Sequence, residues 1–333
     1  IFSASSLSSR NFKSKNFTSA VAAFYAKVNV MADFDLQIQS SASDGRYSPR
    51  ELVKRAADLK LKTIALTDHD TVSGVPEALS AGEDYGVEVI TGIEISAADA
   101  TGDMHILGFG IDHKNLALLQ ALEEAQQARV ERAKEIVRRL QGIGFNVTYE
   151  DVLRFATGSS VGRPHIAMAV LSNPENKKML GEISDVGGFI KAYLVPGKET
   201  YVSHENISVR QAIDLIHGAG GIAAWSHPAL HFDDFDKMES ALKRFVDFGI
   251  EGVEVCNPSH GEAQVRFLNE MAIKYGLLMT AGSDFHTDET AHHDRGGTLS
   301  APNSRAERGG GPELASFTAY GVDVSEIVPK LKE

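Results

Sequence analysis

Short apolar segments alternate with stretches of helical periodicity along most of the chain from Asp33 onward, and this alternation limits the folds open to it. Each apolar segment has the length of a buried strand, and each intervening stretch repeats apolar residues every three or four positions, as an amphipathic helix does. This order of elements is typical of an α/β protein with a mostly parallel sheet. We expect strands at residues 34–38, 63–66, 87–95, 105–111, 222–225, 252–255, 277–280 and 317–320.

The expected helices carry their own start signals. The helix at 49–59 follows Ser48, whose hydroxyl can cap the first turn, and Pro49 stands at the first helical position, where its missing N–H is tolerated. Residues 209–217 and 261–275 repeat the helical pattern.

One long stretch, from 116 to 204, interrupts the alternation. A helix expected at 116–140 is rich in charge pairs four residues apart, and shorter helical pieces follow it. A chain of 333 residues exceeds one average domain but suits a barrel that carries an insertion. We therefore expect an N-terminal extension at 1–32, a barrel domain at 33–115 and 205–333, and a mostly helical insertion domain at 116–204.

Two further segments have unusual composition. Residues 1–32 are rich in Ser and Lys and hold no acidic residue, and we interpret them as a disordered extension ahead of Met31 in preference to an organellar transit peptide. The stretch at 286–313 contains runs of Gly, and a loop of that length is functional or disordered. His292, His293 and Arg295 within it could close over a bound substrate.

Charge and cysteine content exclude several classes of protein. The net charge of −12 argues against broad binding of duplex nucleic acid, which needs a basic surface. The single cysteine, Cys256, excludes an internal disulfide framework and a cysteine-based zinc site, so a reducing, cytoplasmic setting is the default. No segment reaches the roughly 18 apolar residues of a membrane span.

Metal-capable side chains fall at the ends of successive expected strands. The carboxyl ends of barrel strands meet on one face, where catalytic groups collect. A single buried His is more often a core residue than a ligand, but the recurrence at strand ends is not explained by core packing. His105 fits less well, because it stands at the start of its strand. Mixed imidazole and carboxylate ligands suit Zn, Mn or Fe better than Ca. The residues are Asp68, His69, Asp70, Glu94, His105, His227, Asp284 and His286.

These residues lie in longer motifs that recur in a fixed order. The motifs are Asp35-Leu36-x-Ile38-x-Ser40 with Ser43-Asp44-Gly45, Thr67-Asp68-His69-Asp70-Thr71, Gly92-x-Glu94-Ile95-Ser96, His105-Ile106-Leu107-Gly108, Ser226-His227-Pro228 and Ser283-Asp284-Phe285-His286. In this order the chain resembles the PHP (polymerase and histidinol phosphatase) family. Within the insertion, Gly162-Arg163-Pro164-His165-Ile166-Ala167 and Tyr193-Leu194-x-x-Gly197-Lys198 are similar to the subgroup of nucleoside 3′,5′-bisphosphate phosphatases and 5′-3′ exoribonucleases.

The resemblance implies a distorted (β/α)7 barrel that binds up to three divalent metal ions (Mn, Zn, Mg or Fe). It implies a metal-dependent phosphoric ester hydrolase that acts on phosphate monoesters of nucleotides or trims short oligonucleotides, with Asp44, His69, Glu94 and Asp284 in catalysis. One ion would take Asp44, His69 and His286. A second would take His105 and His227 and share Glu94 with a third. That third ion would add Asp284 and a His-x-His pair on the first strand.

The first strand departs from this pattern, because Gln37 and Gln39 stand at both histidine positions. Residues two apart on a strand point to the same side, so both amides are expected to face the site. An amide oxygen is a poor replacement for imidazole toward Zn, although it can contribute weakly to Mg or Mn. The ligand sets of two ions are therefore complete, and the third set is not.

Phosphate recognition is expected from Arg163, since a guanidinium fork matches phosphate oxygens, and also from Lys198 and His165. Each has a plainer alternative: an ion pair for Arg163, solvation for Lys198 and a helix cap for His165. Asp68 and Asp70 either orient ligands from behind or close the local turn.

Three functions remain open. The leading one is the phosphoesterase. The second is a non-catalytic nucleotide-binding or phosphate-binding protein that lost one metal through Gln37 and Gln39. The third, and weakest, is an amidohydrolase acting on C–N bonds, which would also rely on a first-strand His-x-His.

Overall fold

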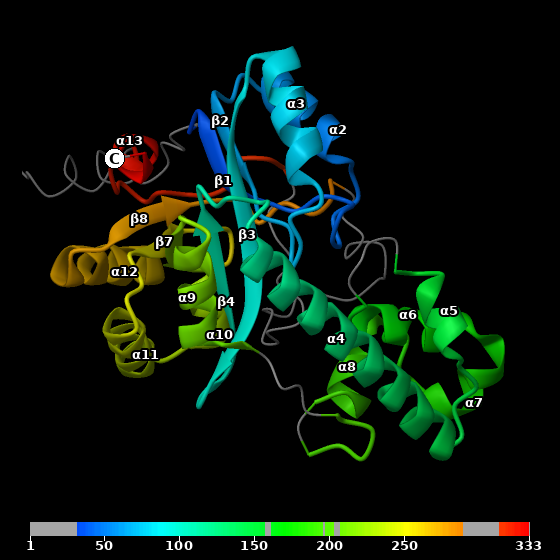
Figure 1. The fold of residues 1–333 in the computed structure, drawn as a ribbon. Coiled ribbons are helices and arrows are strands. Elements are labelled where there is room, and N and C mark those ends of the chain that lie inside the picture. The colour runs from blue at the N-terminus through cyan, green and yellow to red at the C-terminus, as the bar shows by residue number, and fades with distance from the viewer. Residues whose placement is uncertain (1–31, 157–160, 196, 203–206, 289–312, 333) are drawn as a thin grey trace, which may run out of the picture.

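The computed structural model describes residues 32–156, 161–195, 197–202, 207–288 and 313–332 (Figure 1). Its strands form one sheet in the order β1-β2-β3-β4-β6-β7-β8, with the short β5 paired to β3. An isolated parallel bridge between Ile38 and Phe285 joins the two ends of this sheet, so a seven-stranded barrel is nearly closed. The strands are β1 (Phe34–Ile38), β2 (Thr63–Leu66), β3 (Glu88–Asp99), β4 (Gly102–Phe109), β5 (Ile207–Ser208), β6 (Ile222–Trp225), β7 (Gly252–Cys256) and β8 (Leu278–Ala281). The predicted distorted α/β barrel is confirmed.

One strand of the barrel is reversed. β4 runs antiparallel to both β3 and β6, whereas the other neighbouring pairs along the barrel are parallel. The first half of β4 therefore lies beside the carboxyl ends of the parallel strands, and His105 pairs with Ser96 there. The prediction that a strand starts at His105 is wrong, since β4 begins at Gly102. The reversal explains why His105 nevertheless faces the same end of the barrel as the other metal-capable residues.

Helices cover the outside of the barrel (Figure 1). The first, α2, begins with the predicted cap: Ser48 accepts from the backbone of Glu51 while the Glu51 side chain accepts from the backbone of Ser48. The main apolar core lies between helices and strands, and Trp225 is fully buried in it. The helices of this layer are α2 (Pro49–Asp58), α3 (Val75–Tyr85), α9 (Val209–Gly218), α10 (Pro228–His231), α11 (Phe235–Asp247), α12 (Glu262–Tyr275) and α13 (Ile327–Leu331).

The long helix α4 (Leu116–Gly142) runs from the barrel into a smaller helical unit (Figure 1). This unit has an apolar core of its own, in which Phe145 and Phe189 pack edge to face with ring centroids 5.5 Å apart. Its other elements are α5 (Tyr149–Leu153), α6 (Arg163–Ser172), η1 (Pro174–Asn176), α7 (Lys177–Leu180) and α8 (Val186–Tyr193). The domain boundaries at 115/116 and 204/205 stay predictions.

The strand expected at 317–320 is wrong. These residues form no strand, and the segment leads through turns to α13. Phe317 and Ala319 are both buried, and the Phe317 ring lies 5.9 Å from that of Phe34. The alternation of apolar residues that suggested a strand therefore reflects packing of an irregular segment on the core. The expected extension at 1–31 and the loop residues His292, His293 and Arg295 lie outside the described residues. Among those that are described, no helix is long and apolar enough to cross a bilayer.

Candidate metal centre

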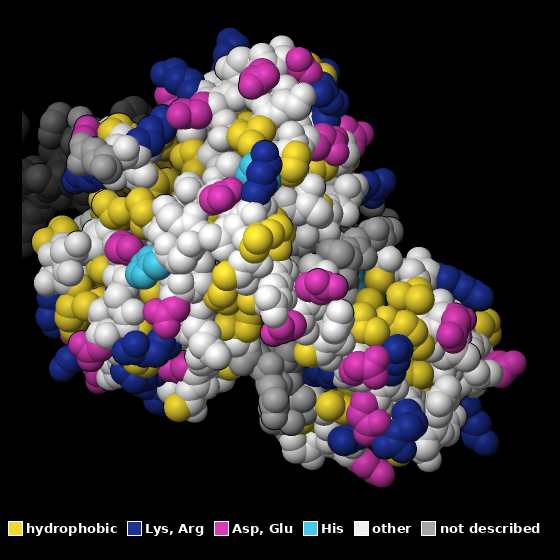
Figure 2. Space-filling model, viewed as in Figure 1, with side chains coloured by type: hydrophobic (Ala, Val, Ile, Leu, Met, Phe, Trp, Pro, Cys, Tyr) yellow, Lys and Arg dark blue, Asp and Glu magenta, His cyan; other side chains and the backbone are white. Residues whose placement is uncertain are grey.

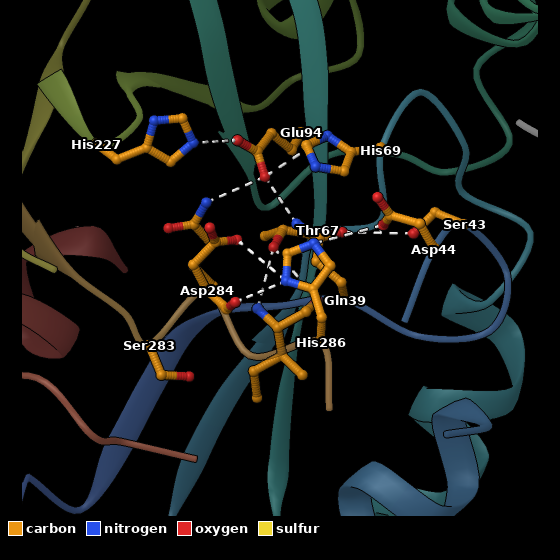
Figure 3. Close-up of polar contacts among 12 residues, drawn as sticks. Gln39, Ser43, Asp44, Thr67, His69, Glu94, His227, Ser283, Asp284 and His286 are labelled. Carbon is orange, nitrogen blue, oxygen red and sulfur yellow. Dashed lines mark hydrogen bonds and ion pairs between the residues drawn. The ribbon is translucent and has the colours of Figure 1, made fainter. Parts of the chain in front are cut away.

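Metal-capable side chains meet at one end of the barrel, and Figure 3 shows how His69, Glu94 and His286 lie among them. They come from both halves of the sheet: from the segments that follow β1, β2, β6 and β8, from the middle of β3 and from the first half of β4. The residues are Asp44, His69, Glu94, His105, His227, Asp284 and His286. The predicted convergence of strand ends therefore describes where the structure places these side chains.

Glu94 is the centre of this group and is fully buried. Its Oε1 atom lies 2.9 Å from His105 Nδ1 and 3.0 Å from His227 Nε2. Ser226 also donates its hydroxyl to Oε1, over 3.0 Å. Burial opposes ionisation, but the charge of His69 and the hydrogen bonds from His105 and His227 hold the pKa of Glu94 well below its usual range. Glu94 is therefore an ionised carboxylate inside the barrel.

Asp44, His69 and His286 form the first group that could hold a cation. Their ligand atoms all lie within 4.8 Å of one another, and His286 Nε2 is 3.5 Å from Asp44 Oδ1. His286 Nδ1 donates to the backbone oxygen of Asp284 over 2.7 Å, which turns Nε2 toward Asp44. Burial lowers the pKa of His286, but the carboxylates of Asp44 and Asp284 outweigh it and raise that pKa to about 9. A divalent cation would replace the proton that these carboxylates attract.

A second group comprises His69, Glu94 and His105, whose ligand atoms also lie within 4.8 Å of one another. Three buried atoms around the two groups have no hydrogen-bond partner among the described residues: Nδ1 of His69, Nδ1 of His227 and Oδ1 of Asp284. Buried polar atoms without partners are rare in folded proteins and often mark an ion or a water. The residues present therefore fit the binding of divalent metal.

The two aspartates beside His69 brace neighbouring segments. Asp68 accepts from Ser40 N (2.6 Å), Ser40 Oγ (2.7 Å) and Ser43 Oγ (2.6 Å), which fixes the loop that carries Asp44. Asp70 has a left-handed backbone with φ of 51°, and its carboxylate accepts from Ser96 N over 2.8 Å. The contacts of Asp68 position Asp44, and the contact of Asp70 with β3 positions His69.

Helix α4 of the insertion reaches this part of the site. Arg129 forms an ion pair with the buried carboxylate of Asp70, and Gln126 donates to the Asp70 backbone oxygen over 2.9 Å. Residues three apart lie on the same face of a helix, so α4 holds Asp70 at both its backbone and its side chain. The insertion is thereby fastened to the turn that carries His69.

The predicted phosphate-binding residues occupy different surroundings. Arg163 begins α6 and lies 3.8 Å from Asp103 of β4, so the ion-pair alternative is present as a loose contact. His165 Nδ1 accepts from the backbone of Gly162 over 3.0 Å, which is the helix cap that the sequence allowed. Burial lowers the pKa of His165, and the charge of nearby Asp44 partly offsets that effect. Lys198 is exposed and makes no side-chain contact with the centre among the described residues.

Several residues of the site were not identified from the sequence. Burial lowers the pKa of Arg132 on α4, and the charge of Arg163 at the start of α6 lowers it further. Glu254 of β7 is fully buried, accepts from the backbone of His227 over 2.7 Å and contacts Asn257 Nδ2 at 3.1 Å. Burial raises its pKa well above the usual range. A carboxylate within the apolar run of β7 was the signal available in the sequence.

A family model described as PHP domain matches residues 35–255. The chain is 32% identical over 273 residues to a 3′,5′-nucleoside bisphosphate phosphatase of Chromobacterium violaceum, and the match covers 82% of this chain and 93% of that protein. It is 34% identical over 253 residues to a 5′-3′ exoribonuclease of Haemophilus influenzae, covering 76% of this chain and 89% of the relative.

The fold is also similar to that of two solved structures. An amidohydrolase from Chromobacterium violaceum, with bound sulfate and no metal, superposes with a TM-score of 0.68 at 32% identity and covers 77% of this chain and 88% of its own. A protein from Bifidobacterium adolescentis assigned as a metal-dependent phosphoesterase superposes with a TM-score of 0.64 at 27% identity, covering 87% and 97%.

Proposed function

The chain belongs to the PHP domain family, and from this premise we propose that it is a metal-dependent phosphoesterase that removes phosphate from nucleotides or trims short oligonucleotides. The observation that carries the proposal is the convergence of imidazoles and carboxylates around Glu94. The reaction adds water across a P–O bond: a monoester gives inorganic phosphate and an alcohol, and a phosphodiester of an oligonucleotide gives a phosphate monoester and an alcohol.

Two divalent cations, from among Mn, Zn, Mg and Fe, fit the ligand sets. Asp44, His69 and His286 would hold one, and His105, His227 and Glu94 the other. The cations would supply Lewis acidity and neutralise the phosphate. Asp284 sets the direction of the His286 ring through its backbone oxygen. Asp44, His69, Glu94 and Asp284 are the residues on which we propose that catalysis depends.

Arg163 is the proposed phosphate clamp. Its partner Asp103 is 61% exposed and 3.8 Å away, and such an ion pair contributes little, so a phosphate can displace it. The sulfate bound by the related amidohydrolase structure has the tetrahedral shape and the charge of phosphate. His165 and Lys198 are proposed as secondary contacts. The cap uses His165 Nδ1, which leaves Nε2 for a substrate oxygen.

The proposed substrate is small and single-stranded. On the face drawn in Figure 2, Lys and Arg side chains are interspersed with Asp and Glu and do not gather into one basic surface. A net charge of −12 also disfavours duplex binding. We propose a cytoplasmic setting on the basis of the single cysteine.

A phosphate-release screen tests this function. The metal-stripped full chain is supplied with Mn²⁺ or Mg²⁺ and offered nucleoside 3′,5′-bisphosphates, nucleoside monophosphates and short 5′-phosphorylated RNAs. We expect metal-dependent release of phosphate from a nucleotide, or of a nucleoside monophosphate from an RNA, and we expect EDTA to abolish it. A protein that binds Mn²⁺ and hydrolyses none of them is not the proposed enzyme.

A non-catalytic nucleotide-binding protein is the second candidate, and the pair Gln37 and Gln39 is the observation that favours it. Calorimetric titration with a bisphosphate distinguishes the two functions. Saturable binding without phosphate release over hours would establish the binding protein, and cleavage of an amide substrate instead would establish an amidohydrolase.

A further inference from the structure

The two oxygens of Glu94 have different surroundings. Oε1 faces the two imidazoles described above, whereas Oε2 accepts hydrogen bonds from the side-chain amides of Gln37 (3.0 Å) and Gln39 (2.7 Å). Both glutamines are fully buried. Two N–H groups therefore converge on the carboxylate oxygen at which the third ion of a His-x-His site would be expected.

A chain of hydrogen bonds fixes which end of the Gln37 amide faces Glu94. The backbone N–H of Ser259 can only donate, and it donates to Asn257 Oδ1 over 2.9 Å. Asn257 Nδ2 is then turned toward Gln37 Oε1, 3.3 Å away. The Gln37 nitrogen is left to donate to Glu94 and to Ser226 Oγ, the latter over 2.9 Å. The oxygen of Gln37 thus points away from Glu94 and offers no lone pair there.

The Gln39 amide is oriented in the same way. Its nitrogen lies 2.7 Å from Glu94 Oε2, and its oxygen lies 3.4 Å from the hydroxyl of Ser43, which donates to it. The backbone on which both glutamines stand is tightly packed. A Cβ on Gly45 would lie 2.1 Å from the backbone oxygen of Gln39, and one on Gly282 would lie 2.5 Å from Gln37 Cβ. These close approaches fix the position of the backbone from which the two side chains extend.

The remaining ligand expected for a third ion is also turned elsewhere. Asp284 Oδ1 lies 3.8 Å from His286 Nδ1, so this carboxylate faces the imidazole of His286. A cation beside Glu94 Oε2 would therefore meet two N–H groups with the positive ends of their dipoles toward it. Hydrogen bonds from two amides to a buried carboxylate supply the compensation that a cation would otherwise give.

We propose that the Gln37 and Gln39 amides take the place of a third cation beside Glu94, so that this chain binds one divalent ion fewer than it would with histidines there. The inference rests on the proposed metal centre but not on any turnover. Gln37 of β1 and Gln39 just after it would then stabilise the charge of Glu94 without a metal ion.

Counting Mn²⁺ tests the proposal. The stripped full chain and its Gln37→His/Gln39→His variant are equilibrated with Mn²⁺, freed of excess ion and analysed by inductively coupled plasma mass spectrometry. We expect the variant to retain one more ion per chain than the wild type. Equal counts, with the variant folded, overturn the proposal.

Thermal unfolding in excess EDTA gives a second readout that does not depend on the histidine variant. Gln37→Met/Gln39→Met keeps the side-chain size but leaves Glu94 Oε2 without donors, so we expect Tm to fall by several degrees. Gln120→Met is the matched control, because Gln120 also donates to a carboxylate, over 3.0 Å, but on the exposed face of α4. A double variant as stable as this control overturns the proposal.

The two proposals fail separately. A wild-type chain that retains the same number of ions as the histidine variant and releases phosphate would overturn only the proposal that the two amides replace a cation. A wild-type chain that shows the one-ion difference and releases no phosphate from any nucleotide would overturn the enzyme alone.

Discussion

Removing the Arg129 guanidinium should destabilise the protein through Asp70. The Asp70 side chain is 1% exposed and that of Arg129 18%. Removal of one partner of a buried ion pair leaves an uncompensated charge and costs roughly 3 to 5 kcal/mol. Because Arg129 retains some contact with water, we expect Arg129→Met to lower the free energy of unfolding by about 3 kcal/mol, the lower end of that range. Asn tolerates a left-handed backbone, so Asp70→Asn removes the charge without adding strain. In that background Arg129→Met should cost less than about 1 kcal/mol.

Urea unfolding of the metal-free protein at 25 °C measures all four members of this cycle. Arg138→Met is the control on the same helix, because Arg138 is 71% exposed, and its ion pair with Glu135 should contribute less than about 1 kcal/mol. Since Asp70 follows His69, Arg129→Met should also weaken Mn²⁺ binding, by roughly tenfold. An equal cost of Arg129→Met in the wild-type and Asp70→Asn backgrounds would refute the reasoning.

Three further predictions concern the centre. Asp44→Asn should lower kcat/KM by about a hundredfold or more and reduce the Mn²⁺ content of the purified chain, with exposed Asp112→Asn as the unaffected control. Arg163→Met should raise KM about tenfold with little change in kcat. Arg154, whose side chain is 76% exposed, is the control, and Arg154→Met should change neither constant. A fall in kcat alone after Arg163→Met would contradict a binding role. His286 has a pKa of about 9 in the fold against 6.5 when unfolded, so its contribution, at most about 3 kcal/mol, is complete below pH 6.5 and is lost as pH rises toward 9. Metal-free protein should therefore lose stability in urea between pH 6.5 and 9, and a flat profile would count against the charged pair of His286 and Asp44.

The sequence predicted the strands best where polar residues interrupt apolar runs. The expected ends of the strands at 34–38, 63–66 and 222–225 agree with β1, β2 and β6. Each is followed by a turn whose side chains are used in the site, so the change in polarity marks the end sharply. At 317–320 the same apolar alternation occurs in a segment without strand pairing, and the pattern alone does not distinguish the two cases.

The set of side chains in the centre was predictable, but their mutual contacts were not. His105 looked misplaced because strand direction depends on pairing, which a single sequence does not reveal. The same limit applies to Gln37 and Gln39. That both face the site follows from the period of a strand. That the nitrogen of Gln37 donates to Glu94 depends on Asn257 and Ser259, which are more than 200 positions away in the chain.

The gap between β8 and β1 gives the metal centre a mechanical consequence. Asp44 follows β1 and His286 follows β8, so they lie on opposite sides of the place where the barrel closes through the bridge of Ile38 and Phe285. Gln39 N donates to Phe285 O over 2.9 Å at the same seam. An ion shared by Asp44 and His286 would act as a cross-link around the circumference of the barrel and tie together segments from nearly opposite ends of the chain. The two ligands are more than 200 residues apart and come together only when the barrel is closed. Binding of the ion and closure of the barrel are therefore coupled in one equilibrium.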